Sequence, residues 1–236
     1  MIPDISWTIA IMCFNELPTL NAVVAQTAEV LSSLDCDYEI IIIDDGSTDG
    51  SGQVADELAN SVQRVRVIHH TANLGIGEVL YSAYSSAEKD WISIVPADGE
   101  FHPSDLLAGY TALDQGTVVC YSLTLLPHVG RRFVSACQRL LNLALFGLSV
   151  RRVNWVKILP AQEIRRFELT SRTPIIETEI LVRLKKRGYR IIELPSQNEI
   201  RVRRTGGMSP VSYLQAVLAS LPATFKLWRS TRRSHP

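Results

Sequence analysis

Two adjacent carboxylates, Asp44 and Asp45, follow directly after four consecutive isoleucines at residues 40–43. A short, β-branched apolar run is typical of a parallel strand that is buried on both faces. Open α/β sheets bind their ligands at the carboxyl ends of such strands. We therefore predict that both aspartates lie at a ligand site. The alternative is that they only hold a turn before the next helix, although Thr48 or Asp49 can cap that helix alone.

Further acidic residues follow two other apolar runs, with Glu16 after residues 8–13 and Asp98 and Glu100 after residues 91–95. Carboxylates can accept hydrogen bonds from a base N–H and from ribose hydroxyls. Mg²⁺ or Mn²⁺ is usually held by one or two carboxylates together with substrate phosphates. Three acidic positions at one sheet edge therefore suggest a site for a sugar-nucleotide and a divalent cation. A plain polar turn is the alternative for Asp98 and Glu100.

A glycine-bearing loop at residues 73–77 precedes a helical pattern. Such a loop can admit a phosphate or allow close backbone approach, and it can equally be a simple turn into the helix. It matches neither the dinucleotide-binding fingerprint nor the P-loop.

The elements that must position these residues alternate along the chain. Strands are predicted at residues 8–13, 38–43, 65–69, 91–95 and 117–123, and helices at 18–34, 53–62, 75–87 and 103–113. This alternation predicts an α/β fold with a doubly wound, mostly parallel sheet and helices on both faces. It does not indicate the order of the strands.

After residue 126 the pattern changes. Helices are predicted at residues 131–146, 174–186 and 210–229, and strands at 153–159 and 189–194. We expect one large domain over residues 1–209. Residues 210–236 are expected to form a C-terminal amphipathic helix and a basic tail, and the apolar face with Trp228 suits the interface of an anionic membrane. Packing of this helix on the core is the alternative.

Bulk composition narrows the classes of partner and compartment. Lysine plus arginine and aspartate plus glutamate both number 24, so the net charge of zero argues against a nucleic-acid partner. Apolar residues make up 46% of the 236 residues, which supports a sizeable core. The four cysteines have no metal-ligand spacing and fit a reducing compartment. No signal peptide or run of about 20 apolar residues is evident, so we expect a cytoplasmic protein.

The joint order of motifs resembles family 2 glycosyltransferases. The motifs lie at residues 14–16, 43–50, 73–77, 97–103 and 204–209. Within that family the chain is most similar to dolichyl- or polyprenyl-phosphate sugar (mannose or glucose) synthases, over about residues 6–215. The resemblance implies an A-type glycosyltransferase fold, Mg²⁺ or Mn²⁺ as cofactor, and inverting transfer from a UDP- or GDP-sugar.

The resemblance also implies roles for individual residues. Nucleotide-sugar binding would fall to Phe14, Glu16, Asp44, Asp45, Ala97, Asp98, Arg204 and Ser209. Asp98 and Glu100 would hold the metal, and Asp98 and Arg204 would be the catalytic residues. The acceptor would meet Arg131, Arg132 and Ser135. Relatives usually carry Asp-x-Asp at the metal, whereas Pro96 occupies the first of these positions here, and Glu100 would restore the lost charge.

The acceptor is inferred from the need for a base. A hydroxyl acceptor must lose a proton to a positioned carboxylate, whereas a lipid phosphate is already an anion. The expected Glu-Asp pair is replaced by Glu177-Thr178-Glu179, which favours a polyprenyl phosphate at the cytoplasmic membrane face. Two alternatives stay open. One is a hydroxyl acceptor with Glu179 as base. The other is a catalytically degenerate nucleotide-sugar-binding partner of a membrane subunit, motivated by Pro96. Oligomeric state is not indicated.

Overall fold

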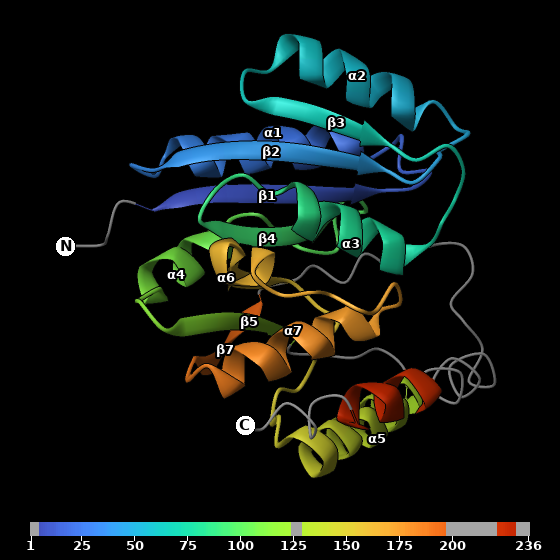
Figure 1. Ribbon diagram of the computed structural model, residues 1–236. Coiled ribbons are helices and arrows are strands. Elements are labelled where there is room, and N and C mark those ends of the chain that lie inside the picture. Colours follow the sequence, from blue (N-terminus) through green and yellow to red (C-terminus); the bar gives the residue numbers. More distant parts are fainter. Residues whose placement is uncertain (1–4, 124–128, 197–220, 230–236) are drawn as a thin grey trace.

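The computed structural model describes residues 5–123, 129–196 and 221–229 (Figure 1). In this part of the chain seven strands form one sheet in the order β3-β2-β1-β4-β6-β5-β7. Their bounds are β1 Ser6–Cys13, β2 Asp37–Asp44, β3 Val65–His69, β4 Trp91–Pro96, β5 Thr117–Leu123, β6 Lys157–Pro160 and β7 Arg190–Ser196. The predicted doubly wound, mostly parallel α/β sheet is thereby confirmed.

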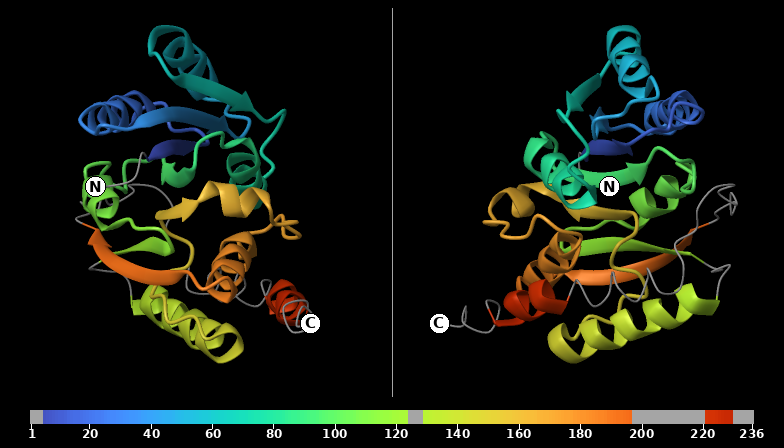
Figure 2. Two further views of the ribbon diagram at one scale, coloured as in Figure 1. Left: turned by 60° about the vertical axis from the view of Figure 1, so that its left-hand side comes forward. Right: turned by 90° about the vertical axis from the view of Figure 1, so that its right-hand side faces the viewer.

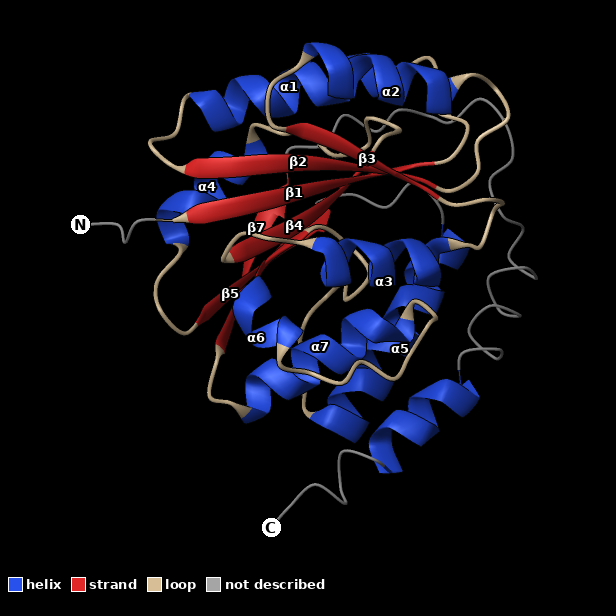
Figure 3. Cartoon of the chain, turned by 45° about the horizontal axis from the view of Figure 1, so that its top comes forward, coloured by secondary structure: helices blue, strands red, loops and turns tan. Residues whose placement is uncertain are grey.

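The helices cover both faces of this sheet (Figure 3). They are α1 Leu20–Ser32, α2 Ser51–Ser61, α3 Ile76–Ser86, α4 Asp105–Ala112, α5 Val129–Phe146, α6 Ala161–Arg165 and α7 Ile175–Lys186. The short α6 was not predicted, and the strand predicted at residues 153–159 is confined to β6. Residues 221–229 are helical and lie beside α5 (Figure 2).

The strand order places the predicted ligand residues together. β1 pairs in parallel with β2 on one side and with β4 on the other, and Cys13 lies opposite Asp44 while Met12 lies opposite Pro96. The arrowheads of β1 to β4 all point the same way in Figure 1. The loops that carry Glu16, Asp45 and Asp98 therefore leave the sheet at one edge.

β6 is the exception to the parallel pattern. It pairs antiparallel with both β4 and β5, over only two residue pairs on each side. β5 and β7 are parallel to each other, so β6 joins this second pair of strands to the first four.

The isoleucine run of β2 is buried on both faces, as its composition predicted. Ile40 and Ile42 pack into the core beneath α1 and α4, whereas Ile41 and Ile43 pack into the core beneath α3 and α7. All four are fully buried. Each such side chain contributes roughly 1.5–3 kcal/mol relative to exposure, so β2 anchors the residues that follow it.

A glycine brings two loops of this edge together. Gly46 has a φ of +71°, and a Cβ built on it would lie only 2.5 Å from the carbonyl carbon of Ala72. The turn after β2 therefore approaches the loop after β3 more closely than any other residue would permit. This contact sets Asp45 against residues 73–75.

Candidate functional site at the carboxyl ends of β1, β2 and β4

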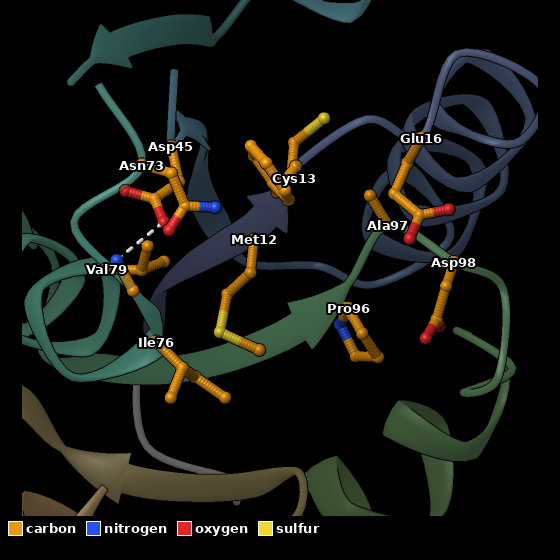
Figure 4. Close-up of a pocket in the computed structure, with 12 residues that line it drawn as sticks. Met12, Cys13, Glu16, Asp45, Asn73, Ile76, Val79, Pro96, Ala97 and Asp98 are labelled. Carbon is orange, nitrogen blue, oxygen red and sulfur yellow. Dashed lines mark hydrogen bonds between the residues drawn. The ribbon is translucent and has the colours of Figure 1, made fainter. Parts of the chain in front are cut away.

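A cavity of about 420 Å³ opens at this edge of the sheet (Figure 4). Its volume lies in the range of small-molecule sites. It is lined by Met12, Cys13, Phe14, Glu16, Asp45, Asn73, Gly75, Ile76, Val79, Pro96, Ala97 and Asp98. In Figure 4 the carboxylates of Glu16 and Asp98 lie on one side of the cavity, and Asp45 lies with Asn73 on the other.

Asp45 fixes the glycine-bearing loop. Its Oδ1 accepts hydrogen bonds from the Leu74 N–H at 3.0 Å and from His70 Nδ1 at 2.7 Å. Its Oδ2 accepts from the Gly75 N–H at 2.9 Å. Because a carboxylate can accept about four hydrogen bonds, capacity remains for a ligand in the cavity. The loop at residues 73–75 thus forms a wall of this site.

Asp44 faces a different set of groups. Its Oδ1 accepts from the Ser47 N–H at 3.1 Å, and its Oδ2 lies 2.9 Å from His69 Nδ1. It is buried and is not among the residues that line the cavity. Of the two adjacent aspartates, Asp45 is therefore the one that a bound ligand can contact.

The polar residues after Asp45 hold the loop that carries Phe14 and Glu16. The Glu16 N–H donates to Ser51 Oγ at 2.9 Å, and the Leu17 N–H donates to Asp49 Oδ2 at 3.1 Å. Phe14 is 40% exposed and lines the cavity, so an aromatic face is available to a planar ligand. The polar loop after β2 thus supplies Asp45 to the cavity lining and positions Phe14 and Glu16.

Asp98 lies in a tight turn after β4. Its Oδ1 accepts the Glu100 N–H at 2.8 Å, and Gly99 has a φ of +73°. Pro96 and Ala97 line the cavity beside Asp98, whereas Glu100 does not line it. Asp98 is therefore the carboxylate that the β4 loop presents to a ligand.

The carboxylates of this cavity fit a divalent cation only if the protein supplies few of its ligands. Within residues 5–123, 129–196 and 221–229, no group of three or more His, Cys, Asp or Glu side chains could hold a metal ion. A hard cation such as Mg²⁺ usually keeps one or two carboxylates and takes its other oxygens from phosphates and water. Asp98 suits that arrangement, with diphosphate oxygens completing the shell.

A second cavity of about 350 Å³ adjoins the first. The two share Met12, Ile76, Pro96 and Asp98. The remaining lining residues are Leu80, Ile94, Asn154, Trp155, Val156, Pro174 and Glu177. Most of these are apolar, so Glu177 stands out as a carboxylate in an apolar wall.

Glu177 belongs to a buried polar network that the sequence did not reveal. The Tyr84 hydroxyl donates to its Oε1, and the Lys157 ammonium pairs with its Oε2. Burial lowers the pKa of Lys157 to about 8, and the electrostatic interaction with Cys120 partly opposes this. A lysine inside a predicted strand and a glutamate among helical isoleucines were the available signals, because such residues are rarely buried without a partner.

Glu179 was the alternative candidate for a catalytic base, but its contacts are with neighbouring protein groups. It is fully buried and accepts the N–H groups of Thr170 and Ser171, at 3.2 Å each to its nearer oxygen, and an ion pair from Arg183 at 2.7 Å. It lines neither cavity. Its contacts fix the loop before α7.

Of the predicted acceptor-binding residues, Ser135 has a described side chain, and it lines neither cavity. Arg204 and Ser209 lie outside the described residues. Arg131 and Arg132 lie in the first turn of α5, and Ser135 lies half-buried one turn later. Among the described residues, no helix is long and apolar enough to cross a membrane.

The sheet order, the helices on both faces and the acidic cavity at the strand ends define an A-type glycosyltransferase fold. A model of glycosyl transferase family 2 matches residues 8–145, and the chain belongs to this family. Solved structures agree on the fold. Glucosyl-3-phosphoglycerate synthase from Mycobacterium tuberculosis, in complex with Mn²⁺, UDP and glucosyl-3-phosphoglycerate, superposes with a TM-score of 0.67 at 18% identity, covering 94% of this chain and 78% of that one. A mannosyltransferase from Pyrobaculum calidifontis, in complex with GDP-Man and Mn²⁺, gives 0.59 at 14% identity, covering 98% and 76%.

Curated relatives match over shorter stretches. Polyprenol monophosphomannose synthase of Mycolicibacterium smegmatis is 30% identical over 112 residues, which are 46% of this chain and 41% of that protein. The glycosyltransferase GlyG of Streptococcus pneumoniae is 40% identical over 60 residues, which are 25% of this chain and 20% of that protein. The chain therefore spans less than half the length of these curated relatives.

Proposed function

We propose that this protein transfers a sugar, with inversion, from a UDP- or GDP-sugar to a polyprenyl phosphate at the cytoplasmic membrane face. The observation that carries the proposal is the cavity into which three loops of one sheet edge bring Glu16, Asp45 and Asp98. Structural neighbours crystallised with UDP or GDP-Man and Mn²⁺ support a nucleotide-sugar donor.

Within this proposal each carboxylate has a defined task. Asp45 and Glu16 accept hydrogen bonds from the nucleoside, with Phe14 beside them at the cavity mouth. Asp98 would hold Mg²⁺ or Mn²⁺, and a cation bound there would supply positive charge for the leaving nucleoside diphosphate. Arg204 and Ser209 are proposed to meet the donor diphosphate, since an arginine fork binds phosphate oxygens bidentately.

A phosphate acceptor accords with the state of the two α7 glutamates. Glu179 is enclosed by Thr170, Ser171 and Arg183. Glu177 is paired with the Lys157 ammonium and accepts a hydrogen bond from the Tyr84 hydroxyl, so both of its oxygens are already engaged. A lipid phosphate needs no base, so positioning and charge neutralisation suffice. The polyprenol-linked relative supports this acceptor class, with Arg131, Arg132 and Ser135 of α5 as its proposed contacts.

Peripheral membrane attachment is part of the same proposal. Leu140 and Leu143 of α5 and Phe225 of the helix at residues 221–229 are exposed large apolar side chains. Lys226 and Arg229 are exposed on the same C-terminal helix. Apolar side chains next to basic ones suit an anionic bilayer surface.

A second candidate is a catalytically degenerate nucleotide-sugar binder, which acts with a membrane subunit. The observation in its favour is Pro96, which lines the cavity beside Asp98 where a second carboxylate is usual. A third candidate keeps the transfer but uses a hydroxyl acceptor. Binding and turnover measurements separate all three.

The first test is calorimetric binding of UDP and GDP, each with and without Mn²⁺, followed by turnover with polyprenyl phosphate in vesicles. We expect metal-dependent binding of one nucleotide and transfer to the lipid. Asp98→Ala should abolish transfer, whereas Asp114→Ala, at an exposed aspartate paired with Arg190, should not change it. Nucleotide binding without turnover would favour the degenerate binder, and turnover only with hydroxyl acceptors would refute the lipid acceptor.

A further inference from the structure

Two adjacent histidines stand at the end of β3, and the proposed function uses neither. His69 is the last residue of β3 and lies in register with Asp44, the last residue of β2. One position further on, the His70 N–H donates to the Asp44 carbonyl oxygen at 2.8 Å. This register places His69 beside Asp44 and His70 beside Asp45.

His69 turns toward the face of the sheet that α2 covers. Its Nδ1 lies 2.9 Å from Asp44 Oδ2, and its Nε2 lies 3.1 Å from Asp56 Oδ1 of α2. The side chain of His69 is 41% exposed. Neither His69 nor Asp44 lines either of the two cavities. This pair therefore belongs to the surface around α2.

His70 turns toward the opposite face, where α3 packs, because successive side chains at a strand end alternate. Its Nδ1 lies 2.7 Å from Asp45 Oδ1, and its Nε2 lies 2.9 Å from Ser82 Oγ of α3. The side chain is only 8% exposed and lines neither cavity, whereas Asp45 lines the first. The ring of His70 thus links α3 to a carboxylate that a ligand can contact, while His70 itself stays behind that carboxylate.

The chemistry of the two partners sets the direction of these hydrogen bonds. A carboxylate only accepts, so the hydrogen between His70 and Asp45 lies on Nδ1. A serine hydroxyl can donate or accept, so Ser82 donates to the Nε2 of a neutral ring and accepts from the Nε2–H of a cationic one. His70 therefore donates to Asp45 in both of its charge states. Ser82 lines neither cavity, so its hydroxyl orients the ring and does not face a substrate there.

These contacts decide which part of Asp45 a ligand can use. Oδ1 accepts from His70 and from the Leu74 N–H, which fills both of its lone pairs. Oδ2 accepts from the Gly75 N–H, so the described contacts leave one lone pair on this oxygen. A carboxylate that is already held in one orientation binds a ligand more tightly than one that must be ordered on binding.

We propose that His70 is a positioning residue for nucleoside binding, which orients Asp45 through its Nδ1–H and leaves the free Oδ2 lone pair for the nucleoside of the donor. This inference rests on the proposed function, in which Asp45 accepts a hydrogen bond from the nucleoside. It assigns the role to one ring nitrogen, so the two nitrogens must be tested separately.

Two amide substitutions separate the ring nitrogens. The side-chain nitrogen of asparagine can take the place of Nδ1, whereas the longer glutamine reaches the place of Nε2. His70→Asn should keep the affinity for UDP or GDP within about threefold, and His70→Gln should weaken it about 10-fold, the change expected for one hydrogen bond to a charged group. A role in packing alone predicts the reverse order, because asparagine leaves the larger void at a buried position. The affinities are measured by calorimetry with Mn²⁺ present.

His69→Asn and His69→Gln are the matched controls, because His69 makes the same kind of pair with an aspartate outside the cavity lining. Both should leave the nucleotide affinity unchanged. Equal losses in His70→Asn and His70→Gln would overturn the proposal. A loss in the His69 variants as large as that in His70→Gln would overturn it too.

A measurement on the unchanged protein keeps the proposal falsifiable if His70→Gln fails to fold. Nitrogen NMR of the five histidines, with His70 assigned by its absence from a variant, reports which ring nitrogen carries the hydrogen. A neutral His70 should show Nδ1–H with and without nucleotide, and Nε2–H would overturn the proposal. Nucleotide binding that does not respond to His70→Gln would overturn this inference alone. Failure of the unchanged protein to bind UDP or GDP would overturn the proposed function together with it.

Discussion

Gly46→Ala is the most informative single substitution for the architecture of the site. Gly46 has a φ of +71°, which costs a residue with a Cβ about 1–2 kcal/mol. Its new Cβ would also lie 2.5 Å from the Ala72 carbonyl carbon and 2.8 Å from the Asn73 nitrogen, and both are backbone atoms. Relieving this overlap requires a backbone shift, and overpacking of this kind costs about 1–3 kcal/mol more.

Gly116→Ala is the matched control. Gly116 has a φ of +95°, and a Cβ built there has no atom within 4 Å. It should therefore show the conformational cost of about 1–2 kcal/mol alone. For Gly46→Ala the sum is roughly 2–5 kcal/mol, and each kcal/mol corresponds to about 2–4 °C in melting temperature at this chain length.

The two variants should differ in function as well as in stability. The shift at residues 72–73 would displace the loop whose Leu74 and Gly75 N–H groups bind Asp45, so Gly46→Ala should also weaken nucleotide binding. Gly116→Ala should not. Urea unfolding and calorimetric nucleotide binding of both variants provide the measurement. Equal destabilisation and equal affinities would refute the argument that the contact between these two loops shapes the site.

Three further predictions concern the acidic edge and the C-terminal helix. Asp45→Asn should weaken nucleotide binding in calorimetry by about 10-fold or more, because Asp45 lines the cavity. Asp44→Asn should mainly reduce stability in urea, because Asp44 does not line it. A larger loss of nucleotide affinity in Asp44→Asn than in Asp45→Asn would contradict this assignment. The pKa of His69 is raised because its ring N–H groups donate hydrogen bonds to Asp44 and Asp56. The His69 ring should therefore stabilise the fold fully below its unfolded pKa of about 6.5, and this contribution should be lost as pH rises through the higher folded pKa. A urea series across this range should show the loss in the unchanged protein and not in His69→Gln. Deleting the chain after residue 210 should reduce vesicle binding and spare nucleotide binding. Loss of folding would show instead that the C-terminal helix belongs to the core, to which Leu227, a buried side chain, would then contribute.

Much of the fold could be predicted from local patterns. The isoleucine run at residues 40–43 indicated a strand covered on both faces, and both cores contain members of it. The alternation of apolar strands and helices indicated the doubly wound parallel sheet, because a parallel pair needs a crossover between its strands. That Glu16, Asp45 and Asp98 lie together at one cavity could be predicted for the same reason, since the carboxyl ends of parallel strands share an edge.

Strand order and the short antiparallel β6 were not readable. Pairing depends on contacts between residues far apart in sequence, such as Trp91 with Pro160. The periodicity of a local sequence segment carries no information about such contacts. The same limit hid Lys157, whose partner Glu177 lies on a later helix.

The sequence by itself determined which residue types stand at the strand ends, and tertiary structure decided which of them face the cavity. Asp44 and Asp45 are adjacent, but successive side chains at a strand end point in opposite directions, so one meets His69 and the other the cavity. Glu177 and Glu179 lie two positions apart on α7, about 200° around the helix. One therefore reaches the second cavity and the other the loop before α7. Neighbours in space, and not the order of residues, assign these roles.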